Sequence, residues 1–259
     1  MKICRFRRST DATARYGLIG EDGVRPCSGP PWDGGEAGGE ASALDQVVLT
    51  APVEPSKIIA IGRNYAAHAR ELGNEVGEVP LVFAKVPSSI IGPEETILLP
   101  PESERVDYEG ELAIVIGARC RRVPRRNWRD VVFGFTCAND VTARDLQRRD
   151  VQFTRGKGFD TFCPVGPWIE TDLDPSDIGV QTRVNDEIRQ SGRTKDLAFP
   201  VPELVEFVSA SMTLLPGDLI LTGTPEGVGP LKDGDVVDVE VEGVGTLRNF
   251  VASESTKFD

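Results

Sequence analysis

The amino-acid sequence predicts a β-rich α+β fold, in which many short strands are accompanied by a few helices. Short runs of apolar and β-branched residues recur along the whole chain, for example at 58–62, 81–85, 112–116 and 131–138. Stretches with a helical pattern are few, and turns rich in Gly and Pro separate the segments. Many strands with few helices are typical of an α+β domain dominated by its sheets.

The first 50 residues predict a small β region followed by a linker. Two short alternating segments, 3–6 and 16–19, lead into a turn at 21–23 and indicate a β-meander. Residues 28–43 are rich in Gly, Pro and Ala, as loops and linkers often are. We therefore expect two parts: a small N-terminal β region with its linker in 1–50, and the main domain in 51–259.

A buried strand over 55–62 is predicted to lead into a helical stretch, 63–72, which Gly73 ends. His68 and Glu71 are three residues apart on this stretch. Residues at that spacing lie on one face of a helix, so we expect the two side chains to meet.

Polar residues follow the strand predicted at 131–138. Asn139 and Asp140 come directly after it, and Asp140 is in position to cap a helix expected over 141–150, which would explain this residue without any ligand role. The Gly-flanked segment 155–164 is predicted to be a loop that can approach a ligand closely.

The last third of the chain predicts a hairpin, a helix and another strand pair. Residues 180–184 and 187–190 are separated by Asn-Asp, which suits a tight hairpin turn. Pro202 suits the first turn of a helix over 202–213. Alternating Val and acidic residues at 237–241 predict a half-solvated strand.

Charge and composition argue against several kinds of partner. The net charge of -12 repels nucleic acid and anionic membranes at long range. The first eight residues lack the apolar core of a signal peptide, and no run approaches the roughly 20 apolar residues of a membrane span. We therefore expect a cytoplasmic protein with no nucleic-acid and no membrane partner. The Gly-rich stretch 223–229 lacks the Gly-Lys-Ser/Thr of a phosphate loop, which argues against nucleotide binding.

The cysteine and histidine counts restrict the chemistry further. The 5 cysteines are widely scattered and form no C-x-x-C pair, which indicates reduced thiols. His68 is the single histidine, so sites that need two or three histidines are excluded within one chain. A bound metal would therefore be held mainly by oxygen atoms.

Glu109 and Glu111 stand two residues apart at the start of the apolar run 112–116. In a strand such side chains share one face, so two carboxylates should lie close together. They stay ionised together if a cation lies between them, and otherwise one takes up a proton. A solvated pair on an exposed strand end is the alternative that these residues alone leave open.

Six motifs follow one another along the chain. They are Asn64-Tyr65-x-x-His68-x-x-Glu71, Phe83-x-Lys85, Asp107-x-Glu109-x-Glu111-Leu112, Asn139-Asp140-Val141-Thr142-Ala143-Arg144-Asp145, Lys157-Gly158-Phe159-Asp160-Thr161 and Thr222-Gly223-Thr224-Pro225-x-Gly227-Val228-Gly229. In this order they resemble the motifs of the fumarylacetoacetate hydrolase family, and in particular its acylpyruvase and 2-hydroxyhepta-2,4-diene-1,7-dioate isomerase branch. The resemblance extends from about residue 55 to 251.

The resemblance implies a mixed β-sandwich roll with a few peripheral helices, which commonly forms a homodimer. It also implies that Glu109, Glu111 and Asp140 bind Mg²⁺ or Mn²⁺. Three carboxylates form a hard-oxygen site, which suits these ions and also Ca²⁺, which can take their place in a crystal.

The resemblance further implies roles for residues around the metal. His68, oriented by Glu71, is the expected catalytic base, and Lys157 is expected to neutralise an oxyanion. Contacts to a small anionic oxo-acid substrate are implied for Arg63, Tyr65, Lys85, Gln147 and Thr224.

We accordingly expect a divalent-metal-dependent hydrolase that cleaves a carbon–carbon bond of a small 2,4-dioxo acid. An acylpyruvate such as fumarylpyruvate or acetylpyruvate would fit, with the ion stabilising an enolate. Two alternatives use the same site: an oxaloacetate decarboxylase and a 2-hydroxyhepta-2,4-diene-1,7-dioate isomerase. A third, of another class, is a non-catalytic paralogue that binds metal and oxo acid without turnover.

Overall fold

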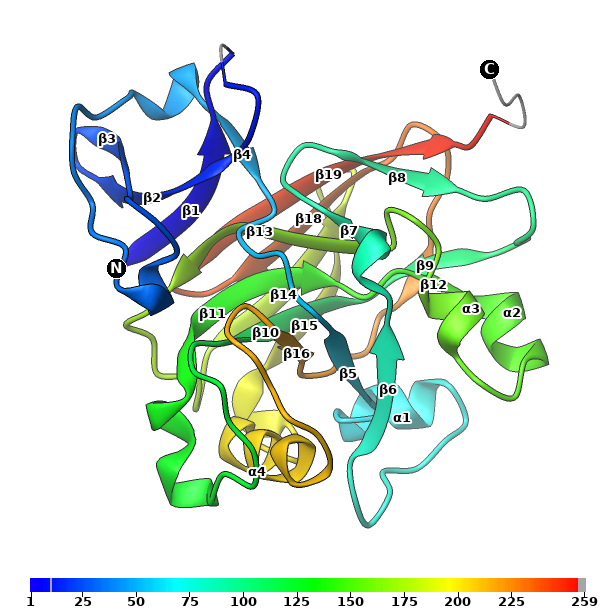
Figure 1. Cartoon of the computed structure of the whole chain (residues 1–259). Coiled ribbons are helices and arrows are strands. Elements are labelled where there is room, and N and C mark those ends of the chain that lie inside the picture. Colours follow the sequence, from blue (N-terminus) through cyan, green and yellow to red (C-terminus); the bar gives the residue numbers. More distant parts are fainter. Residues whose placement is uncertain (10, 256–259) are drawn as a thin grey trace.

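Two large β-sheets and a small third sheet contain most of the regular structure (Figure 1). The computed structural model describes residues 1–9 and 11–255. The first sheet contains β1 (Lys2–Arg7), β2 (Arg15–Gly20), β3 (Gly23–Pro26), β4 (Val48–Thr50), β5 (Ile58–Gly62), β6 (Leu81–Lys85), β7 (Ile90–Ile91), β10 (Gly110–Ile116), β11 (Val132–Asn139), β13 (Cys163–Glu170) and β16 (Leu219–Leu221).

The second sheet contains β8 (Thr96–Leu99), β14 (Gly179–Val184), β15 (Glu187–Arg193), β18 (Val236–Val241) and β19 (Gly245–Ser253). The third contains β9 (Val106–Tyr108), β12 (Thr142–Ala143) and β17 (Gly229–Pro230). The α-helices are α1 (Ala66–Glu71), α2 (Arg144–Arg149), α3 (Thr154–Lys157) and α4 (Val201–Ser211). Short 3-10 turns cover Pro31–Asp33, Leu44–Gln46, Pro87–Ser89, Arg125–Asp130 and Thr194–Asp196.

The first sheet has the order β3-β2-β1-β13-β11-β10-β16-β5-β6, and the second has the order β15-β14-β18-β19-β8. Most neighbours are antiparallel, but β16 pairs with β5, β13 with β7 and β19 with β8 in parallel. The helices lie outside the sheets, with α2 and α3 side by side (Figure 1). The mixed β-sandwich with peripheral helices that the sequence predicts is confirmed.

The main core lies between the two large sheets, and alternate side chains of β10 contribute to it. Its side chains alternate, so that Leu112 and Ile114 join the core formed with Val239 of the second sheet. Ala113 and Val115 face the other way and join a separate apolar cluster. Each fully buried Leu or Ile contributes about 1.5–3 kcal/mol. The carboxylates at the start of β10 are thus attached to a strand that is covered on both faces.

The N-terminal region continues the first sheet. Strand β1 pairs with β13, and the N-terminal ammonium of Met1 lies 2.7 Å from a carboxylate oxygen of Glu170. A small apolar cluster of Cys4, Phe6 and Val24 packs within the region itself. The boundary that the sequence predicts near residue 50 stays a prediction, and the first sheet continues across this position.

Several local predictions are confirmed. Asn185 and Asp186 join β14 to β15 and both have positive φ, 52° and 65°, as a two-residue hairpin turn requires. Helix α4 carries Pro202 in its first turn. All of the cysteines are free. Within the described part of the chain, no helix is long and apolar enough to cross a membrane.

Two local predictions are wrong. Asp140 does not cap a helix, because Thr142 and Ala143 form β12 against β9 and helix α2 begins only at Arg144. The segment 155–164 is not entirely a loop, because its first three residues belong to the short helix α3. In both places pairing or packing with a distant segment overrides the local pattern.

Candidate metal and active site

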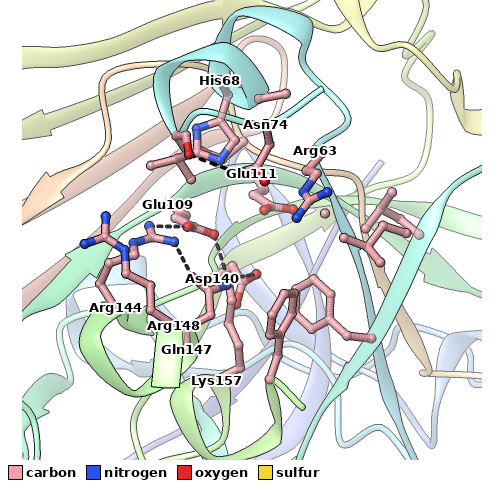
Figure 2. Close-up of a pocket in the computed structure, with 18 residues that line it drawn as sticks. Arg63, His68, Asn74, Glu109, Glu111, Asp140, Arg144, Gln147, Arg148 and Lys157 are labelled. Atoms are coloured by element: carbon pink, nitrogen blue, oxygen red, sulfur yellow. Dashed lines mark hydrogen bonds and ion pairs between the residues drawn. The ribbon is translucent and has the colours of Figure 1, made fainter. Parts of the chain in front are cut away.

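Three buried carboxylates line a cavity of about 300 Å³ (Figure 2). Glu109, Glu111 and Asp140 are 4%, 2% and 1% exposed, and each offers an oxygen atom that lies within 4.8 Å of the other two. The pair expected from the sequence is therefore buried, which excludes a solvated strand end.

The register of two neighbouring strands brings these carboxylates together. Gly110 of β10 pairs with Asn139 of β11. Glu109 and Glu111, which flank Gly110, therefore lie close to Asp140, which follows Asn139. The backbone N–H of Glu109 donates to the Asn139 side chain at 2.9 Å, and that of Asp140 donates to the carbonyl of Glu109 at 2.8 Å. Gly110 must lack a side chain, because a Cβ would lie 2.0 Å from Oγ1 of Thr182.

Glu111 is held by the segment that follows β16. The backbone N–H of Gly223 donates to Oε2 of Glu111 at 2.6 Å. Gly223 has φ +101°, and a Cβ there would lie 2.8 Å from the side chain of Asn64, so the position favours glycine. Thr224 donates to the carbonyl of Gly110 at 2.8 Å and fixes the same segment against β10.

Three cations surround two of the carboxylates. The Lys157 ammonium lies 2.7 Å from both Glu109 and Asp140 (Figure 2). Arg144 donates to Glu109 at 2.5 Å and to Asp107 at 2.9 Å. Lys85, which is wholly buried, lies 2.8 Å from Oδ1 of Asp140. Within the described residues Glu111 has no cationic partner.

The ionisation of the cluster follows from this uneven pairing. Burial opposes the charge on Glu109, but Lys157 and Arg144 outweigh it and hold the pKa of Glu109 well below its usual value. Burial, together with Asp140 and Glu109, raises the pKa of Glu111 well above its usual value. The pKa of Lys157 is raised despite burial, because Asp140 and Glu109 favour the ammonium.

These residues fit a divalent cation. Oδ1 of Asp140 is buried and, among the described residues, no group donates a hydrogen bond to it, although Lys85 is close. Glu111 adds a carboxylate that forms no ion pair with any described side chain. A converging set of carboxylate oxygen atoms suits a hard divalent ion rather than a metal that prefers sulfur or nitrogen.

His68 lines the same cavity, and Glu71 lies behind it. Nδ1 of His68 is 3.4 Å from Oε2 of Glu71, and the backbone N–H of Gly227 donates to both oxygen atoms of Glu71 at 3.1 and 3.2 Å. Helix α1 brings the two side chains together, as their spacing predicts. Nε2 of His68 is therefore the ring nitrogen left to act in the cavity.

Most of the residues expected at the site line the cavity. These are Arg63, His68, Glu109, Glu111, Asp140, Gln147, Lys157 and Thr224. Glu71 contacts the site through His68. Tyr65 and Lys85 are not part of the lining: Tyr65 is buried in a backbone bridge to Leu197, and Lys85 lies behind Asp140. The structure therefore does not support direct substrate contacts for these two residues.

Arg144 is the residue whose role the sequence reasoning missed. Its guanidinium joins Asp107, Glu109 and Gln147, the last through a hydrogen bond of 2.7 Å to the side-chain oxygen. Arg144 lies four residues after Asp140 in the Asn-Asp-Val-Thr-Ala-Arg-Asp motif. This position could have identified it as a residue of the site. The lining also includes Arg148 and apolar side chains, among them Leu72, Leu81, Phe83 and Phe153.

Comparison with known proteins agrees with this geometry. A family model described as Fumarylacetoacetate (FAA) hydrolase C-terminal matches residues 57–252, and one described as Rv2993c-like, N-terminal matches residues 1–52. The oxaloacetate tautomerase YisK of Bacillus subtilis is 45% identical over 231 residues, which are 83% of this chain and 77% of the relative.

Two solved structures are similar over nearly the whole chain. The 5-carboxymethyl-2-hydroxymuconate delta-isomerase of Mycobacterium smegmatis has a TM-score of 0.91 and 46% identity, covering 98% of this chain and 100% of that one. The fumarylacetoacetate hydrolase of Exiguobacterium antarcticum has a TM-score of 0.87 and 41% identity with the same coverage. With the family model matching three quarters of its length and its fold shared throughout, this chain belongs to the fumarylacetoacetate hydrolase family.

Proposed function

We propose that the protein is a divalent-metal-dependent isomerase that interconverts the keto and enol forms of a small 2-oxo acid such as oxaloacetate. The carboxylate triad beside His68 carries the proposal, because it joins a cation site to a proton acceptor in one cavity. The names of two similar proteins, a tautomerase and an isomerase, support enolisation over the carbon–carbon hydrolysis expected from the sequence.

Glu109, Glu111 and Asp140 would hold the ion, which we propose to be Mg²⁺ or Mn²⁺. When bound, it would draw electrons from the keto oxygen of a 2-oxo acid and lower the cost of forming an enolate. Lys157 adds a positive charge at the same end of the cavity.

We assign the proton transfer at C3 of the substrate to His68. Lys157 forms ion pairs with two carboxylates as an ammonium, and so it has no lone pair with which to accept a proton. When Nε2 of His68 takes the C3 proton, the C–H electron pair forms the C2=C3 double bond. The carbonyl π pair moves to the C2 oxygen, which takes up a proton to give the enol. Glu71 orients the imidazole through Nδ1.

Hydrolysis is the second candidate, and the His68–Glu71 pair is the observation that favours it. A histidine backed by a carboxylate can remove a proton from water as well as from carbon. Attack of that water on the distal carbonyl of an acylpyruvate would cleave the carbon–carbon bond. Decarboxylation of oxaloacetate would need the enolate but no attacking water.

One set of assays separates these reactions. The loss of enol absorbance is followed with oxaloacetate, acetylpyruvate and fumarylpyruvate, each with Mg²⁺, with Mn²⁺ and with a chelator, and products are identified by NMR. We expect metal-dependent equilibration of enol and keto oxaloacetate without an equal yield of pyruvate. Cleavage of an acylpyruvate at a higher kcat/KM would replace the proposal by hydrolysis. A metal-loaded protein with no turnover of any of the three would be a non-catalytic paralogue.

A further inference from the structure

Two arginine residues that line the cavity have no hydrogen-bond or ion-pair partner for their side chains among the described residues. Arg144 and Lys157 both form ion pairs with carboxylates of the cluster or behind it. The side chains of Arg148 and Arg63 also line the cavity, yet neither makes a hydrogen bond or an ion pair with any residue in the described part of the chain. Arg63 and Arg148 therefore give the cavity two positive charges that the carboxylate cluster does not neutralise.

Helix α2 accounts for the place of Arg148. Arg144 and Arg148 are four residues apart, so they lie on one helix face, with Arg148 one turn farther along. Figure 2 shows Arg148 beside Arg144, on the side of the carboxylates away from Arg63. The next residue, Arg149, lies 3.9 Å from Asp150 and does not line the cavity.

The charges of the cluster, the ion and the substrate indicate which ligand Arg148 could bind. Four carboxylates in and behind the cluster are balanced by four cations. They are Asp107, Glu109, Glu111 and Asp140, against Lys85, Arg105, Arg144 and Lys157. A divalent ion adds two positive charges, which the near carboxylate of a 2-oxo acid and the enolate oxygen neutralise. A second carboxylate on the substrate would need a further cation.

We propose that Arg148 binds the distal carboxylate of a dicarboxylic 2-oxo acid and so selects dicarboxylates over monocarboxylates. The inference rests on the proposed function, because it assumes that the 2-oxo acid end lies at the carboxylate triad. Arg63 lies beside Glu111, at the metal end, whereas Arg148 lies past Arg144 (Figure 2). The planar guanidinium fork matches a carboxylate with two parallel hydrogen bonds.

Calorimetry with two stable probes tests this assignment without turnover. 2-Oxoglutarate and 2-oxopentanoate have the same carbon chain and differ only in the distal carboxylate. Each is titrated into the full-length, Mn²⁺-loaded protein. We expect 2-oxoglutarate to bind at least about tenfold more tightly, as one charge-assisted contact permits. Arg148→Gln should abolish this preference by weakening 2-oxoglutarate alone, while Arg149→Gln should retain it as the matched control.

The assignment is overturned if Arg148→Gln keeps the wild-type preference, or if Arg63→Gln alone removes it. It is also overturned if wild-type protein binds both probes equally. The proposed function fails in a different way: enolisation would be absent while the dicarboxylate preference persisted. Circular dichroism of each variant confirms that the fold is intact.

Discussion

The Lys85 ammonium lies 2.8 Å from Oδ1 of Asp140, yet this oxygen accepts no hydrogen bond from the described residues. Lys85 donates instead to the backbone carbonyls of Val141 and Lys157, at 3.2 and 2.5 Å. Its charge stabilises the carboxylate while leaving a lone pair free. Lys85 thus supports the cluster from behind and anchors the backbone of Lys157.

Lys85→Met should destabilise the protein, because it leaves a buried carboxylate with one cation fewer. Loss of one partner of a buried ion pair costs about 3–5 kcal/mol. Urea denaturation at pH 7 with a chelator measures the free energy of unfolding. Lys232→Met, at an exposed lysine that forms no ion pair with a described residue, is the control. An unchanged midpoint for Lys85→Met would show that its charge is not needed.

Glu111→Gln should weaken Mn²⁺ binding by at least about 100-fold, since it removes one charged ligand of three. Without metal the same variant should be no less stable than wild type, because Glu111 has no cation partner among the described residues and is close to two other carboxylates. Calorimetry measures the first effect and thermal unfolding with a chelator the second. Unchanged affinity for Mn²⁺ would remove Glu111 from the metal site.

His68→Gln should lower kcat for enolisation by about 100-fold or more, the usual contribution of a general base, while Mn²⁺ affinity stays unchanged. Glu71→Gln should cause a smaller loss, because Glu71 acts through the imidazole. The exchange of C3 hydrogen for deuterium, followed by NMR, reports the proton transfer directly. Full exchange in the His68 variant would assign the base to another group.

The buried thiols should not react with iodoacetamide in the native protein at pH 8. Burial raises the pKa of Cys4, Cys137 and Cys163 to about 12, so the reactive thiolate is scarce below that pH. Cys27 is partly exposed, and we expect it to be modified first. Mass spectrometry identifies the labelled sites, and protein unfolded in guanidinium should be labelled at all of them. Rapid native labelling of Cys137 or Cys163 would contradict the packing.

The sequence predicts the local features of the site better than its long-range contacts. Strand β10 and the shared face of Glu109 and Glu111 follow from a short apolar run and the two-residue period of a strand. The proximity of Asp140 to these two glutamates depends on the register between β10 and β11. This register brings together residues such as Glu109 and Asn139, which are 30 positions apart in the sequence. No local pattern encodes that register, and only the order of motifs indicated it.

The ion pairs could not be read from the sequence for the same reason. Lys85 is at the end of β6, and its distance from Asp140 depends on how β6 and the segment after β11 pack. The expected helix cap at Asp140 failed because β12 pairs with β9, a contact of high sequence separation. Arg144 lay within a recognised motif, but its three partners are set by tertiary structure.

The close approach of Gly110 to Thr182 has a consequence for anyone who wishes to redesign the metal preference. The two glutamates on either side of this glycine are attached to a point where the first sheet touches the second. The position of this part of β10 is therefore limited from behind, by its close contact with Thr182. A substitution at Thr182 would displace the segment that carries both glutamates without replacing any metal ligand, which makes the second sheet the natural starting point for tuning the ion.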